Sequence, residues 1–119
     1  MVIWLGRLTL LMVLATLGKV VFRRLPRSAF QKKGLEIFTK VHPWAGVLAL
    51  AVGMSHGLLA YGPNFLFTGH VLWLMIFLGT LTGYVLDRKI DGGVLRVHRL
   101  SSLGVMVMLL VHIVFRDLI

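Results

Sequence analysis

The chain has 119 residues, and its composition separates it from ordinary soluble proteins. Hydrophobic residues make up 58% of it and the mean hydropathy is +0.91, so the sequence indicates one small domain embedded in a membrane. The absence of cysteine excludes thiolate ligands, thiol catalysis and disulfides.

Four apolar stretches are long enough to cross a bilayer, which takes about 20 mostly apolar residues. The sequence therefore predicts an all-α fold, an integral membrane four-helix bundle that occupies residues 1–119 as a single transmembrane domain. The predicted spans cover residues 2–22, 41–61, 69–86 and 97–119.

The net charge of +9 is unevenly distributed along the chain. Seven Lys and Arg residues fall between Lys19 and Lys40 and four between Arg88 and Arg99, whereas the link after the second span has none. By the positive-inside rule, the first and third links face the cytoplasm and both termini face outside, which predicts a multi-pass protein of the inner (cytoplasmic) membrane. We interpret the basic residues as topology signals that contact anionic membrane lipid, and we expect no nucleic-acid partner.

The first span and the link after it contain two polar features. Arg7 lies about one and a half helical turns inside the outer end, where a charge is costly unless it reaches the surface or meets an anion; both interpretations stay open. Ser28 and Gln31 have the spacing of a capping box, which predicts a short helix over about 28–39 at the cytoplasmic interface.

The second span places His42 and His56 fourteen residues apart. Fourteen residues of α-helix return a side chain to within about 40° of its first direction, roughly 21 Å further along. The positions between them on that face are small and include Gly46, Ala49 and Gly53. A flat object could therefore approach the helix closely on this face.

Proline and glycine mark the expected helix ends. His42 precedes Pro43, and a residue before proline is biased away from helical dihedrals, so we expect His42 to cap the second span or to lie at a kink. Gly62 begins the short link that follows the span, and Gly92 with Gly93 is expected to turn the third link.

The third span begins near Thr68, a candidate helix cap, and carries a fifth histidine, His70. A wet interfacial histidine is one interpretation of His70, and a hydrogen bond to an outer cofactor or a proton relay is the other. Gly79 and Gly83 form a small-xxx-small pattern, which is typical of close helix contact.

The fourth span repeats the spacing of the second with His98 and His112. Because the second and fourth spans would run parallel, His42 and His98 fall at the cytoplasmic depth and His56 and His112 at the outer depth. The sequence thus predicts two pairs of facing imidazoles, one above the other.

Two imidazoles at each level suit haem iron better than zinc or copper, which usually recruit three or four nearby ligands. Haem supplies four equatorial nitrogens and needs only two axial ligands, and such cofactors are often built into bundle cores from facing helices. We therefore predict two haem b groups. His42 and His98 would bind the inner haem iron, and His56 and His112 the outer haem iron.

The two histidine segments, HPWAGVLALAVGMSH and HRLSSLGVMVMLLVH, resemble those of two-haem transmembrane b-type cytochromes. The resemblance is chiefly to the ferric reductase-like transmembrane domain shared by ferric reductases, the NADPH oxidase family and a haem subunit of bacterial methionine sulfoxide reductase. It includes Gly46 after the first histidine and the pair His98 and Arg99. The cytochrome b of quinol-oxidising respiratory complexes has a similar arrangement.

This resemblance implies electron transfer across the membrane through bis-histidine haem b. Members usually have more spans, and many carry a cytoplasmic flavin and nicotinamide domain, so the chain resembles a conducting core that requires a separate donor and acceptor. Haem propionates are anionic, so we expect Arg7 and Arg116 near the outer haem and Arg99 near the inner one.

The function expected from these observations links a cytoplasmic-side flavoprotein or quinol to an outer acceptor, in a subunit of a membrane oxidoreductase rather than a complete enzyme. Two alternatives stay open. One is a cofactor-free helical membrane subunit, and the other is a quinone, oxygen or ferric reductase that acts at a haem edge. Assembly as a homo-oligomer is also left open.

Overall fold

The computed structural model describes residues 1–62 and 68–115, which form four α-helices and no β-strand. The helices are α1 (Val2–Arg24), α2 (Ala29–Tyr61), α3 (Thr68–Arg88) and α4 (Gly92–Val114). All four are long and apolar enough to cross a membrane. The prediction of an all-α, multi-pass membrane protein is thereby confirmed.

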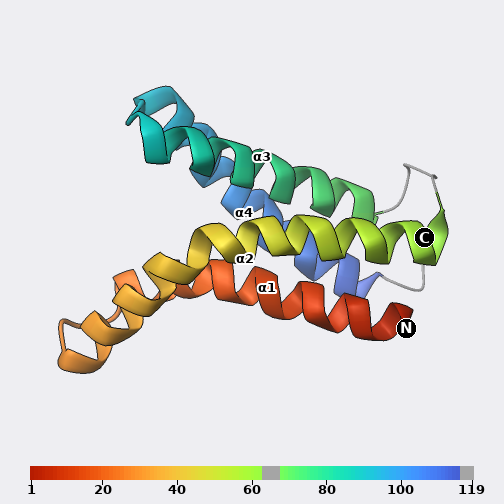
Figure 1. Cartoon of the computed structure of the whole chain (residues 1–119), viewed down its shortest axis with the longest axis horizontal. Coiled ribbons are helices and arrows are strands. Elements are labelled where there is room, and N and C mark those ends of the chain that lie inside the picture. Colours follow the sequence, from red (N-terminus) through yellow and green to blue (C-terminus); the bar gives the residue numbers. More distant parts are fainter. Residues whose placement is uncertain (63–67, 116–119) are drawn as a thin grey trace.

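The helices alternate in direction along the long axis, so α2 and α4 run parallel, as predicted (Figure 1). α1 packs along α2 and α3 packs along α4, while α2 and α3 join these two hairpins. Among the described residues, no Cα atom of α2 lies within 8 Å of one in α4. The links 25–28 and 89–91 lie at the same end of the bundle, next to Arg23, Arg24 and Arg88, and we call this the basic end.

All four helices contribute to a small apolar core. Because lipid is as apolar as the core, a membrane bundle needs few fully buried side chains, and large apolar residues are exposed on every helix. Trp73 of α3 also donates its indole N–H to the Leu50 carbonyl of α2 at 3.0 Å, which ties the two hairpins together. The buried core residues are Val13, Ala49, Leu72, Ile76 and Val105.

The predicted interfacial helix and the second span form one helix of 33 residues. Ser28 is its N-cap and accepts a hydrogen bond from the Gln31 backbone N–H at 3.1 Å, as expected. The reciprocal half of the capping box does not form, because the Gln31 side chain donates to the Phe22 carbonyl of α1 at 3.0 Å. Of the two expectations for His42, the cap is wrong, since α2 starts well before it, and the kink is the one that remains.

Helix α2 continues through Pro43 because α1 supports it on the N-terminal side of the proline. Phe38 stacks on Phe22 with ring centroids 5.2 Å apart, and the absence of a side chain at Gly18 gives the Phe38 ring its place. Proline lacks the N–H that would bond to the carbonyl one turn earlier, and α2 bends in this region (Figure 1). The conformational bias of a residue before proline is therefore outweighed by tertiary packing.

The other helix ends divide between confirmed and wrong predictions. Gly62 ends α2 with φ +66°, a backbone conformation that glycine adopts at no steric cost. Its N–H donates to the Leu58 carbonyl at 3.0 Å. Gly92 and Gly93 do not form the turn; they are the first residues of α4. Asp91 caps this helix by accepting from the N–H groups of Gly93 and Val94, at 2.8 and 3.0 Å.

Candidate functional site

His42 of α2 and His98 of α4 face each other near the basic end. Their ring centroids are 6.1 Å apart, the ring planes are inclined at 79°, and both side chains are half-buried. Two imidazoles bonded to opposite sides of one first-row metal ion, at about 2.0 Å each, would have centroids roughly 6 Å apart. The observed separation therefore fits a pair of axial ligands, and we call this pair the basic-end site.

The Nδ1 atoms of this pair are engaged by neighbouring helices. His42 donates its Nδ1–H to the Thr16 carbonyl of α1 at 3.0 Å. His98 donates its Nδ1–H to the Gly79 carbonyl of α3 at 2.9 Å, with the Thr82 hydroxyl 3.2 Å from the same nitrogen. A carbonyl can only accept, so each neutral ring carries its proton on Nδ1 and keeps the Nε2 lone pair for a metal.

His56 of α2 and His112 of α4 lie at the other end of the bundle, and we call these two histidines, which are predicted to form the second pair, the opposite-end site. His56 donates its Nδ1–H to the Val2 carbonyl in the first turn of α1 at 3.0 Å. Nδ1 of His112 lies 2.9 Å from the Thr68 hydroxyl in the first turn of α3. Both histidines are half-buried. That their rings face each other stays a prediction.

The partners of the histidines were not predicted from the sequence. Val2 and Thr16 are fourteen residues apart, so each histidine of α2 meets an α1 carbonyl in the same relative position. A main-chain carbonyl has no side-chain signal, so these two partners could not have been found in the sequence. Thr68 and Thr82 are also fourteen apart, and this repeat was visible beside the repeated histidines.

The small residues predicted to line the histidine face of α2 permit close packing with α1 and α3. A Cβ at Gly46 would lie 3.1 Å from the Thr80 hydroxyl, and a Cβ at Gly53 would lie 3.3 Å from the Thr9 methyl group. Ala49 is fully buried in the core. The contact of Gly46, Ala49 and Gly53 with a haem edge therefore stays a prediction.

The glycine pair Gly79 and Gly83 marks the contact of α3 with α4. The Gly79 carbonyl accepts from His98, and a Cβ at Gly83 would lie 3.3 Å from Cε1 of the same ring. His70, in the first turn of α3, is half-buried. Its proposed acid or relay role stays a prediction.

The structure describes two of the three arginines that were predicted to lie near haem propionates. Arg7 is exposed on α1, and its guanidinium lies 5.0 Å from the Trp4 ring centroid. Arg99 is exposed and directly follows His98 on α4. Arg116 lies outside the described residues.

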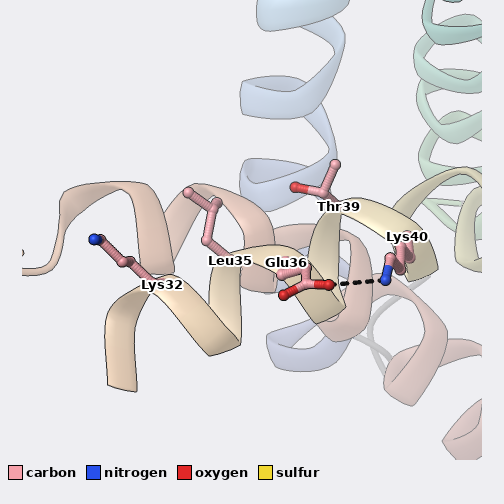
Figure 2. A pocket seen from close by; sticks show the side chains of 5 residues that line it. All are labelled: Lys32, Leu35, Glu36, Thr39 and Lys40. Atoms are coloured by element: carbon pink, nitrogen blue, oxygen red, sulfur yellow. Dashed lines mark hydrogen bonds and ion pairs between the residues drawn. The ribbon is translucent and has the colours of Figure 1, made fainter. Parts of the chain in front are cut away.

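Shallow hollows lie on the N-terminal part of α2, away from the histidines. One, of about 340 Å³, is lined by five side chains that include the ion pair between Lys40 Nζ and Glu36 Oε1 at 2.9 Å (Figure 2). The hydrogen bond and charge of Lys40 lower the pKa of Glu36, and the same contact raises the pKa of Lys40. Another hollow, of about 530 Å³, lies next to it, lined by Arg27, Ser28, Ala29 and Lys32.

The hollows contain no histidine, so the two histidine pairs are the candidate functional site. Within residues 1–62 and 68–115, no three His, Asp or Glu side chains cluster as they would around a zinc ion. Comparisons of the chain with protein-family models, with curated proteins and with solved structures gave no match.

Proposed function

We propose that this chain is a membrane electron-transfer protein that holds two b-type haems, one at each histidine pair. The observation that carries the proposal is the basic-end site. There, two rings from parallel helices that otherwise stay apart face each other at 6.1 Å, each with its Nδ1–H donated to a neighbouring helix. Haem would supply reversible one-electron chemistry at each pair.

The protein's own residues orient the imidazoles. The hydrogen bonds to the carbonyls of Thr16 and Gly79 hold the two rings and direct their Nε2 atoms away from α1 and α3. Both rings are half-buried, so they are partly shielded from water. The resemblance of both histidine segments to two-haem cytochromes supports the same assignment.

The spacing of the two sites suits conduction across a bilayer. Fourteen residues of helix separate the histidines by roughly 21 Å, within a hydrocarbon core of about 30 Å. One haem would thus lie near each face of the membrane. We propose a flavoprotein or quinol as the donor at the basic end and a separate acceptor at the other end.

Haem content tests the proposal directly. The protein, expressed with added haem precursor and purified in detergent, should contain about two haems per chain by pyridine haemochrome analysis and show the sharp visible bands of low-spin haem on reduction. The His70→Ala variant is the matched control, because its histidine belongs to neither pair, and it should keep both haems. A folded, colourless preparation would contradict the proposal and favour a cofactor-free helical subunit.

A further inference from the structure

Helix α3 contains the dipeptide Thr-Gly twice, as Thr68-Gly69 and Thr82-Gly83. The two copies are fourteen residues apart, the same spacing as His98 and His112 on α4. Because α3 and α4 are antiparallel neighbours, moving fourteen residues forward on one helix matches moving fourteen back on the other. The later dipeptide therefore meets His98, and the earlier one meets His112.

The contacts at the two places are alike. The Thr82 hydroxyl lies 3.2 Å from Nδ1 of His98, and the Thr68 hydroxyl lies 2.9 Å from Nδ1 of His112. A Cβ at Gly83 would lie 3.3 Å from Cε1 of His98. Each threonine thus faces a ring nitrogen while the following glycine leaves room for the adjacent ring carbon.

The equivalent contact at Gly69 is equally close. A Cβ there would lie 3.2 Å from Cε1 of His112, a distance at which the ring would have to shift. A side chain at either glycine would therefore push its histidine a few tenths of an ångström away from α3. The glycines fix how near the rings can come, and the threonines fix which ring atom faces α3.

The hydrogen bonds at Thr82 have a defined direction. Its hydroxyl donates to the Leu78 carbonyl of its own helix at 2.7 Å, which leaves its lone pairs to accept from His98. Nδ1 of His98 then donates to the Thr82 oxygen and the Gly79 carbonyl, and the Nε2 lone pair remains available. Thr68 would serve His112 in the same way if its hydroxyl accepts.

We propose that the two Thr-Gly dipeptides are positioning elements for the iron ligands of α4. The threonine hydroxyl holds the Nδ1 edge of the ring toward α3, so that Nε2 points away from this helix, and the glycine sets the ring's distance from α3. This inference depends on the proposed function, because it assigns His98 and His112 as haem ligands. On α2 the same task falls to the carbonyls of Val2 and Thr16, which no side-chain substitution removes.

The test compares Thr82→Val and Gly83→Ala with Thr68→Val and Gly69→Ala in the haem-loaded protein. Transfer of haem to apomyoglobin measures retention at each site, and a redox titration followed by visible absorption measures the two midpoint potentials. The first two variants should weaken retention at the basic-end site by about 10-fold or more and shift its potential, and the last two should do so at the opposite-end site. Thr82→Ser, which keeps the hydroxyl, should restore the wild-type values.

Two matched controls guard against general effects of substitution. Ser55→Ala removes an exposed hydroxyl that bonds to the Ala51 carbonyl of its own helix. Gly57→Ala adds a Cβ that would meet no atom within 4 Å. Both variants should keep the retention and potentials of the wild type.

The outcomes separate the inference from the proposed function. If wild type holds two haems and the four variants match it in retention and potential, or if each variant disturbs both sites equally, the positioning role is wrong while the two-haem assignment stands. If wild type binds no haem, the proposed function fails and the inference fails with it.

Discussion

The basic-end site and the opposite-end site are built from the same four helices, and the described contacts of their histidines differ. At the basic end, His42 and His98 both donate to main-chain carbonyls. At the opposite end, His56 donates to a carbonyl, whereas His112 meets the Thr68 hydroxyl, a bond compatible with either tautomer. Backbone carbonyls of the described residues therefore fix the tautomer of three histidines, whereas the Thr68 contact by itself allows either tautomer of His112.

The largest expected effect is the loss of one haem when a histidine of one site is replaced. His98→Ala should remove the basic-end haem and His112→Ala the opposite-end haem, so that each variant keeps about one haem per chain by pyridine haemochrome analysis. The remaining haem should differ between the variants in midpoint potential, because the two sites have different hydrogen-bond partners. Loss of both haems in each single variant would contradict two independent sites.

Substitution of Gly6 should disturb the opposite-end site alone. A Cβ there would lie 3.0 Å from Cε1 of His56, so the ring must move. We expect Gly6→Ala to weaken retention of that haem by about 10-fold in transfer to apomyoglobin, with Gly57→Ala as the unaffected control. Equal retention in Gly6→Ala and wild type would show that the ring has more freedom than these contacts allow.

Substitution of Trp73 should affect the two sites alike. Its indole bonds to the Leu50 carbonyl between the hairpins, at a level between the two histidine pairs. Trp73→Phe should lower stability by about 1 kcal/mol, measured by thermal unfolding in detergent, and leave the haem count unchanged. A selective loss of one haem would mean that this bond belongs to one site.

The ion pair of Glu36 and Lys40 should give the smallest effect, because both groups are exposed and lie beyond the basic-end site. The lowered pKa of Glu36 means that its contribution is present above its ordinary value of 4.5 and is lost as the pH falls through the lower folded value. The raised pKa of Lys40 means that its contribution is present below 10.5 and is lost as the pH rises through the higher folded value. Glu36→Gln should therefore melt slightly earlier than wild type at pH 7, and this difference should shrink as the pH falls below 4.5, with no change in either haem.

Periodic features of the sequence predicted most of the fold. Hydropathy located four helices, and the repeated spacing of the histidines with parallel α2 and α4 brought His42 opposite His98. The union of the interfacial segment and the second span in one helix was not predicted, because it depends on packing against α1, which no local pattern reveals. The Asp91 cap was missed because the two glycines that follow it favour a turn equally well.

Only the side chains of the candidate site could be predicted from the sequence. The four histidines are visible in the sequence, but the carbonyls of Val2, Thr16 and Gly79 that hold three of them are not. The Thr-Gly repeat of α3 is the exception, since its spacing equals that of the histidines. A search for matching repeats on neighbouring helices would have found it.

Paired substitutions test most directly whether histidines of α2 and α4 share each haem. His42→Ala with His98→Ala removes both ligands of the basic-end site and should still leave about one haem per chain, whereas His42→Ala with His112→Ala removes one ligand from each site and should leave none. If the first combination loses both haems, or the second keeps one, the histidines are not paired across α2 and α4 as proposed.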